Sequence, residues 1–315
     1  MRVAVYGAGA IGAFYGARMS DGGADVSLIS RGANLRALRD RGLTLVTPER
    51  TTRHRLPASD DPATIGPVDV VLFCVKSYDT ADAAGRLGPL IRDGTAVVSL
   101  QNGVDNEERI AAAVGWEHVV GGSAYILAAI REPGIVDASG PRRIVFGEWA
   151  GGEPSERVTA ILDVCARGGV PAEAARDVQV AKWEKFTLLV AFSSMTAATG
   201  LPLGAIRESP AARAMLREIM VEVWTVGRAA GVALADDLVE RQFALLNGQA
   251  YGASTSLQYD RSAGHRMELQ ALQGTVRRLG AAHGVKTPAT DAAYAFIEPW
   301  AIRNELPEAD RPAMR

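Results

Sequence analysis

The chain has 315 residues, of which 48% are apolar and 22% are charged, and its formal net charge is −2. These ordinary globular values permit sizeable cores, and the length favours two domains of ~150 residues. The nearly balanced charge excludes a polyanion-binding signature, so we expect no nucleic-acid partner.

Short apolar runs alternate with helical patterns through the first half of the chain. Strands are expected at 2–6, 24–30, 68–76 and 95–103, helices at 9–23, 31–42 and 80–91, and a hairpin-like excursion at 43–56. This alternation indicates βαβ units and a parallel sheet. Two further apolar runs, 118–130 and 142–149, lack a long intervening helix, so we expect antiparallel additions to the sheet edge.

The second half changes to long helical patterns, at 178–199, 209–231, 235–246 and 263–284. Prolines near the ends of these patterns are typical of helix boundaries. The sequence therefore predicts an α/β Rossmann-type domain at 1–175, followed by an all-α domain at 176–308. The polar residues 309–315 are expected to form a frayed tail.

The two cysteines, Cys74 and Cys165, form neither a disulfide framework nor part of a Cys/His cluster, so no metal site is expected. Their number fits a reducing compartment. A signal-peptide pattern is absent, and no apolar run reaches the ~18–20 residues that span a bilayer. We therefore expect a soluble cytoplasmic protein with no membrane partner.

A glycine motif, G-x-G-x-x-G, lies between the first expected strand and the first expected helix. In that context the first glycine permits a tight turn, the second lets the backbone approach a pyrophosphate, and the third lets helix and strand pack closely. The alternative is a glycine-lined helix–strand contact without a ligand. The expected cofactor-binding residues of the loop are Gly7, Ala8, Gly9, Ala10, Ile11 and Gly12.

The end of the second strand decides between NAD(H) and NADP(H), because an NAD site places an acidic residue there for the ribose 2′-hydroxyl. This chain has Ser30 and Arg31 instead, with no acidic residue before Asp40. A guanidinium can hold a 2′-phosphate through paired hydrogen bonds, so the sequence favours NADP(H). Arg31 could alternatively be a solvated arginine at a helix start.

Three other residues are candidates for the chemistry. Lys76 and Asn102 end two strands at the carboxyl edge where open α/β sheets bind ligands, although charged strand ends and Asn-Gly turns are also common without function. The Asn102 amide could donate to a substrate or to the nicotinamide carboxamide of the cofactor. Lys185 lies in a mostly apolar helical stretch, where desolvation would lower its pKa toward the range useful for proton donation. An exposed helix-end lysine is its alternative, and periodicity does not single out a carboxylate partner.

Several motifs together resemble the ketopantoate reductases, or 2-dehydropantoate 2-reductases, over nearly the whole chain. They are GAGAIG at the amino terminus, Arg31, CVKSYDT around Lys76, SLQNGVDNEE around Asn102, WEKF around Lys185, and Ser256 with Glu268 in STSLQYDRSAGHRMELQAL. The resemblance implies a Rossmann domain followed by a helical domain, and NADPH-dependent reduction of a 2-oxo acid to a 2-hydroxy acid, in the family's case for pantothenate biosynthesis.

The resemblance also implies roles for individual residues. Lys185 would be the general acid that protonates the ketone oxygen, and Glu268 would pair with it and help to position the substrate. Ser256 would hydrogen-bond the carboxylate end of the substrate, and Asn102 would assist in the cleft. Arg31 would hold the 2′-phosphate and Lys76 would lie along the cofactor.

This chain departs from the family pattern in part of the substrate shell. The family's lysine helix carries asparagines four and eight residues later, where this chain has Leu189 and Ser193, the latter retained as a predicted substrate-binding residue. Gln270 and Gln273 replace an aspartate and an asparagine after the glutamate. Two alternatives therefore remain: a relative acting on a more apolar keto acid or ketone, and a non-catalytic NADP(H) sensor. A homodimer is also possible.

Overall fold

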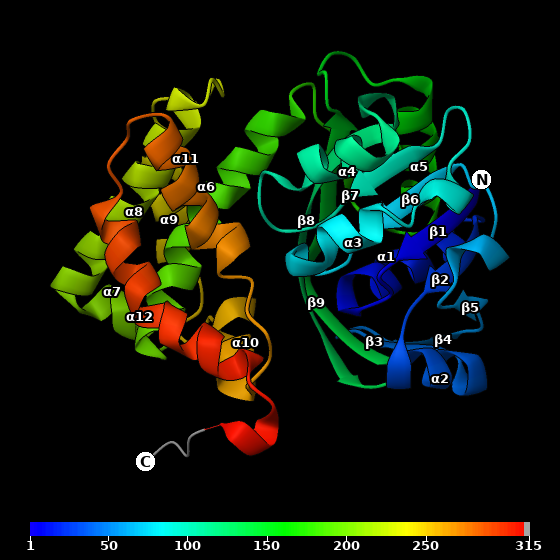
Figure 1. The fold of residues 1–315 in the computed structure, drawn as a ribbon, viewed down its shortest axis with the longest axis horizontal. Helices are drawn as coiled ribbons and strands as arrows, with labels where there is room; N and C mark the ends of the chain where they lie inside the picture. The colour runs from blue at the N-terminus through cyan, green and yellow to red at the C-terminus, as the bar shows by residue number, and fades with distance from the viewer. Residues whose placement is uncertain (312–315) are drawn as a thin grey trace. The chain divides into compact units, whose positions relative to one another are not determined.

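The computed structural model describes residues 1–311 and divides the chain into two compact units (Figure 1). The α/β unit comprises residues 1–101 and 105–181, and the helical unit comprises residues 102–104 and the chain from Lys182 onward. The division falls between Ala181 and Lys182, whereas the sequence predicted a domain boundary after residue 175. The architecture confirms the predicted fold class of an α/β domain followed by an all-α domain.

The α/β unit is built on a ten-stranded mixed sheet with the order β4-β3-β9-β8-β7-β6-β1-β2-β5, and β10 pairs with β9. The strands are β1 (Arg2–Tyr6), β2 (Asp25–Ile29), β3 (Leu43–Val46), β4 (Thr51–His54), β5 (Ala58–Ser59), β6 (Val70–Phe73), β7 (Ala96–Ser99), β8 (Val119–Glu132), β9 (Ile135–Glu148) and β10 (Ala172–Ala174). The five strands from β5 to β7 in this order pair in parallel, as predicted.

The predicted antiparallel additions are β8 and β9, which pair antiparallel along most of their length. Their expected place at the sheet edge is wrong, because the β3–β4 hairpin lies beyond β9. Each strand of the β8–β9 pair has 14 residues, so its far half extends past β7 and gives β3 a parallel partner at Ile135–Asp137.

Five α-helices complete this unit: α1 (Ala10–Asp21), α2 (Gly32–Arg41), α3 (Thr80–Ala84), α4 (Asn106–Val114) and α5 (Glu156–Arg167). Every residue of α1 from Gly12 to Met19 is buried, because the helix contacts β1 and β2 as well as β8, β9 and α5. The helix predicted at 80–91 is shorter than expected, since Gly85 follows its last residue and a 3-10 turn contains Pro89. Helices α4 and α5 were not predicted from the sequence.

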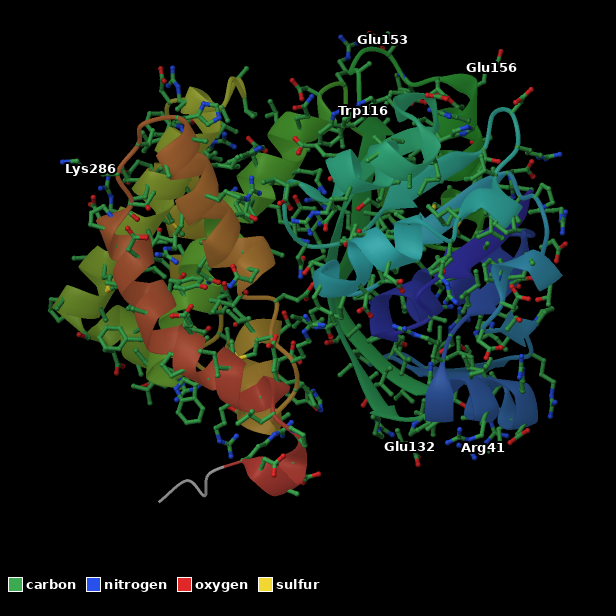
Figure 2. The ribbon with its side chains drawn as sticks, in the orientation of Figure 1. Arg41, Trp116, Glu132, Glu153, Glu156 and Lys286 are labelled. Atoms are coloured by element: carbon green, nitrogen blue, oxygen red, sulfur yellow. The ribbon has the colours of Figure 1, made fainter. Side chains whose placement is uncertain are left out.

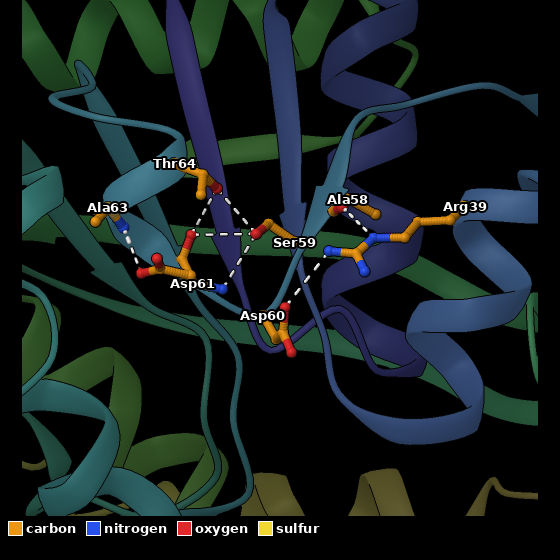
Figure 3. Close-up of polar contacts among 7 residues, drawn as sticks. All are labelled: Arg39, Ala58, Ser59, Asp60, Asp61, Ala63 and Thr64. Atoms are coloured by element: carbon orange, nitrogen blue, oxygen red, sulfur yellow. Dashed lines mark hydrogen bonds and ion pairs between the residues drawn. The ribbon is translucent and has the colours of Figure 1, made fainter.

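Two sets of polar contacts lie near β2 in the chain, one made by the end of α2 and the other around β5. Arg41, at the end of α2, lies beside Glu132 in Figure 2, and its guanidinium donates to the Pro133 carbonyl. Figure 3 shows the polar contacts around β5, where the Ser59 hydroxyl accepts from the Asp61 N–H and from the Thr64 hydroxyl. The Ser59 carbonyl in turn accepts from the backbone N–H of residue 30, which precedes Arg31.

The helical unit contains most of α6 (Val178–Thr199), and after it α7 (Leu203–Glu208), α8 (Pro210–Ala229), α9 (Leu238–Asn247), α10 (Ser256–Ala263), a π turn (Gln270–Gly274), α11 (Thr275–Ala282) and α12 (Pro288–Glu305). The helix predicted at 263–284 is wrong in its first part. Gly264 adopts a left-handed conformation (φ 71°) that ends α10, and regular structure resumes at Gln270. Glu268 therefore lies just before a helical segment and not within one.

Buried polar side chains cap the later helices. The Glu222 carboxylate accepts hydrogen bonds from the N–H groups of Ala289 and Thr290 in the first turn of α12. The Asn304 amide donates to three carbonyls at and beyond the end of α10. These contacts satisfy helix ends that would otherwise be costly to bury. The predicted tail begins with a 3-10 turn at Glu308–Asp310, and residues 312–315 lie outside the described residues.

Candidate functional site

The carboxyl ends of parallel strands form one edge of the sheet in the α/β unit. β1 pairs in parallel with β2 and β6, and β6 pairs in parallel with β7. Ligands of open α/β sheets bind outside this edge. The loops that follow β1, β2 and β6 contain the predicted cofactor residues of this unit, which are the glycine loop, Arg31 and Lys76, so the structure places these predictions at one edge.

The first and third glycines of the loop after β1 have no room for a side chain. Gly7 has a φ of +93°, and a Cβ there would lie 2.7 Å from the backbone nitrogen of Val75. A Cβ on Gly12 would lie 2.4 Å from the carbonyl oxygen of Gly7 and 2.8 Å from a methyl carbon of Val5. Both glycines are therefore required by the fold itself.

Gly9 differs, because no heavy atom of residues 1–311, apart from its chain neighbours, lies within 4 Å of its Cβ position. It caps α1 without any side-chain hydrogen bond, and the N–H groups of the first turn (Ala10, Ile11 and Gly12) have no acceptor within their own helix. Backbone donors beside open space, at the positive end of a helix dipole, suit a pyrophosphate. The loop therefore fits a dinucleotide.

Arg31 lies just past β2, and its side chain is 67% exposed. Its guanidinium forms an ion pair with Asp79, which follows β6, with 2.8 Å between Nη2 and Oδ2. A guanidinium has five N–H donors, so this contact leaves others for a phosphate. The Asn34 amide donates to the Ala8 carbonyl and to the Ser30 hydroxyl, which ties the glycine loop to the end of β2.

Lys76 is exposed just beyond β6, at the predicted edge. The segment around it is held by Gln101, whose amide donates to the Val75 carbonyl at 3.0 Å and to the Thr80 hydroxyl at 2.7 Å. Asn102 is the next residue along the chain. Gln101 and Thr80 thus hold the segment around the predicted site residue Lys76, although neither was predicted from the sequence to have a role.

Lys185 lies on α6, and its ammonium donates to Oδ1 of Asn102 at 3.0 Å. Residues 102–104 group with the helical unit, so this contact is internal to that unit. Glu268 is 8% exposed and Lys182 is 3% exposed, and both act electrostatically on Lys185. The fold thus brings the predicted Lys185, Glu268 and Asn102 together, with Lys182 as an additional cation.

Burial lowers the pKa of the Lys185 ammonium to about 7. The cause is mainly desolvation, which disfavours the charged form, and the positive charge of Lys182 lowers the pKa further. The Glu268 carboxylate acts in the opposite direction. An ammonium with this pKa can both donate and regain a proton near neutral pH, which is the property of a general acid.

Ser193 lies one helical turn beyond Leu189, deep inside the helical unit and only 1% exposed. Its hydroxyl donates to the Val190 carbonyl and accepts from Nε2 of Gln273 at 3.0 Å. Gln273 also donates to Ser194 at 2.9 Å. The predicted substrate-binding hydroxyl thus joins helix α6 to the π turn, and this geometry favours a packing role.

Ser256 is the exposed first residue of α10, and the hydroxyl of Thr255 caps that helix by accepting from the Gln258 N–H. Its backbone N–H is one of the free donors of a helix start. Gln270, the other departure in this region, donates to the hydroxyl of Tyr294 at 2.7 Å and serves packing against α12.

Lys182 and Asp79 are not among the site residues predicted from the sequence. The spacing of Lys182 and Lys185 was a usable signal, because residues three apart share a helix face. Asp79 gave no local signal, since it is 48 residues from Arg31 along the chain. Burial raises the pKa of the Cys74 thiol to about 12, which disfavours a reactive thiolate at this position. Residues 1–311 include no group of three or more His, Cys, Asp or Glu side chains placed to hold a metal ion.

The sequence matches two family profiles, one after the other. Residues 3–151 match "Ketopantoate reductase PanE/ApbA", and residues 177–300 match "Ketopantoate reductase PanE/ApbA C terminal". The 2-dehydropantoate 2-reductase of Halobacterium salinarum is 33% identical over 290 residues, which cover 91% of this chain and 95% of that protein. The enzyme of the same name from Mesorhizobium japonicum is 28% identical, with 96% and 98% coverage.

Solved structures agree in fold over the same span. A PanE/ApbA family ketopantoate reductase from Ralstonia eutropha superposes with a TM-score of 0.89 at 31% identity, covering 97% of this chain and 100% of that one. A D-mandelate dehydrogenase bound to NADH and anilino(oxo)acetate superposes with a TM-score of 0.88 at 19% identity, covering 98% and 100%. The second likeness concerns the fold alone. Among the described helices, none is both long and apolar enough to cross a membrane.

Proposed function

Because the chain belongs to the PanE/ApbA ketopantoate reductase family, we propose that it reduces a 2-oxo acid to a 2-hydroxy acid with NADPH, and that ketopantoate (2-dehydropantoate) is its first candidate substrate. The family makes the chain an oxidoreductase acting on CH–OH groups. The cofactor preference, the substrate and the residue roles below are the proposal.

The observation that carries the proposal is the environment of Lys185. Its ammonium donates to Asn102, is acted on by the buried Glu268, and has a pKa lowered to about 7 by burial. In this arrangement the positive charge of the Lys185 ammonium stabilises the negative charge that develops on the ketone oxygen. Lys185 then donates a proton to that oxygen. Asn102 holds the lysine in place through their hydrogen bond.

The α/β unit supplies the cofactor residues of the proposal. The N–H groups at the start of α1 bind the pyrophosphate beside Gly9, and the free arms of the Arg31 guanidinium bind the 2′-phosphate. Lys76, exposed at the same edge, lies along the cofactor. When bound, the nicotinamide supplies the hydride.

In the helical unit, Ser256 offers its hydroxyl and a free N–H at the start of α10 to the carboxylate end of the substrate. The Glu268 carboxylate favours the charged form of Lys185 and helps to position the substrate. Ser193 is not included, because its hydroxyl is already used by Val190 and Gln273.

The test is steady-state kinetics with NADPH across a panel of 2-oxo acids that includes ketopantoate. We expect measurable turnover, with ketopantoate among the preferred substrates. NADH serves as the cofactor control, and Arg31→Ala should raise the KM for NADPH about tenfold or more with little change for NADH, since it removes charge-assisted hydrogen bonds. Equal use of NADH and NADPH by the unaltered protein would contradict the role given to Arg31.

Leu189 favours a second candidate, a more apolar 2-oxo acid or ketone, because it places an isobutyl group on the helix that carries Lys185. A site that lacks a hydrogen-bonding partner discriminates against a substrate that needs one. Higher kcat/KM for branched or aromatic 2-oxo acids than for ketopantoate would select this candidate. Tight NADPH binding with no turnover on any 2-oxo acid or ketone would select the sensor.

For the oligomeric state we propose a homodimer. Phe296 and Ile302, 67% and 60% exposed, are large apolar side chains of α12. A relative of known fold, 18% identical, is described as a dimeric ketopantoate reductase from Staphylococcus aureus. Light scattering should give twice the 33.3 kDa chain mass, and Phe296→Glu should reduce it to that of one chain.

A further inference from the structure

The π turn of the helical unit begins two residues after Glu268. The N–H of Gly274 donates to the carbonyl of Leu269 at 3.0 Å, five residues earlier, which is the hydrogen bond that defines such a turn. The N–H of Leu272 donates to the carbonyl of Glu268 at 3.2 Å, so the backbone of Glu268 is bonded to the turn. Where the π turn lies in the unit therefore determines where Glu268 lies.

Gln273 ties this turn to α6. Its side chain is 0% exposed, and its Nε2 donates to the hydroxyls of Ser193 at 3.0 Å and Ser194 at 2.9 Å. Burying an amide costs free energy unless hydrogen bonds replace those made with water, whereas a methionine of the same length packs without that cost. The amide therefore indicates that the two hydrogen bonds do more than fill space.

The tie connects the segments that carry Lys185 and Glu268. Lys185 lies on α6 about two turns before Ser193, and Glu268 lies five residues before Gln273. The charged groups that act on Lys185 include Lys182 and Glu268. Lys182 belongs to the same helix, so the backbone of α6 fixes its place. Glu268 belongs to another segment, so contacts between α6 and the π turn must fix its place.

We propose that Gln273 is a positioning residue: by donating to Ser193 and Ser194, it holds the π turn against α6 and keeps the Glu268 carboxylate at a fixed place beside Lys185. The inference rests on the proposed function, in which Lys185 is the proton donor. Gln270, on the same turn, donates instead to Tyr294 of α12.

The contrasting role for Gln273 would be to stabilise the fold alone. The two roles differ in what they do to Lys185. A residue that only stabilises the fold changes the free energy of unfolding and leaves the proton affinity of Lys185 as it was. A residue that positions Glu268 changes that proton affinity, and does so only while the carboxylate is present.

The first test titrates Lys185 in the full-length protein. The chain has four lysines: Lys76, Lys182, Lys185 and Lys286. Labelling with [13Cε]lysine therefore gives a simple NMR spectrum, in which Lys185→Met identifies the signal of Lys185. We expect Gln273→Met to lower the titration midpoint of Lys185 by about half a pH unit, because a carboxylate that is held less firmly favours the charged form less. Gln242→Met, which removes a buried amide from α9, is the matched control and should leave the midpoint unchanged.

The second test asks whether the effect passes through Glu268. In a Glu268→Gln background, Gln273→Met should move the midpoint by less than about 0.1 pH unit, because the carboxylate that it positions is gone. Ser194→Ala breaks one of the two hydrogen bonds from the α6 side and should lower the midpoint in the same direction by less than Gln273→Met does. An unchanged midpoint in both Gln273→Met and Ser194→Ala, or equal shifts with and without the carboxylate, would overturn the inference.

Kinetics give an independent readout. A lower midpoint leaves less of Lys185 charged above neutral pH, so Gln273→Met should reduce kcat/KM for the preferred 2-oxo acid about threefold at pH 8 and less than twofold at pH 6. Equal reductions at both pH values would indicate a structural role and overturn the inference. Absence of turnover in the unaltered protein would overturn the proposed function, while the NMR titrations would still decide whether Gln273 positions Glu268.

Discussion

The glycine loop of the α/β unit and the lysine cluster of the helical unit differ in the groups that they present: backbone N–H groups in the loop and side chains in the cluster. The loop presents backbone groups, since Gly9 leaves open space beside the free N–H groups of α1. The lysine cluster (Lys182, Lys185, Asn102 and Glu268) consists of side chains that are far apart in sequence, since Lys185 and Asn102 are separated by 83 residues. One site is local and the other exists only after folding.

This difference determines what a substitution can reveal. In the loop, a side chain can block a ligand without disturbing the protein, or disturb the protein without reaching the ligand, depending on which glycine is replaced. In the cluster, Lys182 and Glu268 change the proton affinity of Lys185, because charges interact strongly where water is excluded. The loop can therefore be dissected sterically and the cluster by titration.

The largest effect is expected from Lys185→Ala. Loss of a general acid lowers kcat by about 100- to 10,000-fold. The affinity for NADPH, measured by fluorescence titration, should change little, because the glycine loop, Arg31 and Lys76, to which we assign the cofactor, lie in the other unit. Lys286→Ala is the matched control, since Lys286 is an exposed lysine of the same unit (Figure 2). Retention of more than about a tenth of kcat in Lys185→Ala would remove the residue from the mechanism.

The second contrast is between two glycines three residues apart. Gly9→Val should weaken NADPH binding about 10–100-fold by excluding the phosphates from the helix start, at a stability cost below about 1 kcal/mol. Gly12→Val should destabilise the fold by about 1–3 kcal/mol, because its Cβ would lie 2.4 Å from the Gly7 carbonyl oxygen. NADPH titration and thermal denaturation of both variants would test this contrast. Equal losses of stability in the two variants would contradict it.

The parts of the fold that were predictable are those with a strong local signal. The β1-α1-β2 sequence combines short apolar runs with a glycine motif, and both survive in the structure. α5 carried a signal that was overlooked, as Val158, Ile161 and Cys165 are apolar at helical spacing. The break between α10 and the π turn was harder to foresee, because it depends on the left-handed Gly264 within an otherwise helical pattern.

The candidate site also has one part with a local signal in the sequence and another that depends on the fold. The glycine motif alone predicts that the first turn of α1 begins beside open space at Gly9. The surroundings of Lys185 do not follow from its own helix, because Glu268 comes from a segment 83 residues later and no periodicity selects that carboxylate among the others. The burial of Ser193 was equally inaccessible, since it depends on Gln273 packing across from the π turn.

The acidity of Lys185 offers a finer test of the cluster. Its pKa is lowered from 10.5 to about 7, so the charged, proton-donating form declines as pH rises through 7 and kcat/KM should fall about tenfold per unit above that point. Lys182→Met should move the midpoint to higher pH and Glu268→Gln to lower pH, because the two partners act in opposite directions. A pH profile that is level from 6 to 9, or a shift of both variants in one direction, would refute the electrostatic account.

The same lowered pKa has a consequence for stability. Below pH 7 the folded protein must hold a charged Lys185 against its desolvation, and between pH 7 and 10.5 the unfolded chain binds the proton that the folded protein has lost. Stability from this group therefore rises with pH across that window. Lys185→Met should lose this rise, as denaturant titrations at pH 7 and 9 would show.

The smallest effect is expected at the ion pair of the cofactor edge. Asp79 contacts Arg31 at 2.8 Å, and its carboxylate would both occupy part of the guanidinium and repel a 2′-phosphate. Exposed ion pairs contribute at most about 1 kcal/mol, so Asp79→Asn should lower the KM for NADPH about two- to fivefold and leave the KM for NADH unchanged. An increase in the KM for NADPH would mean instead that Asp79 orients Arg31 for the phosphate, which would make this edge, like the lysine cluster, a site built from interacting side chains.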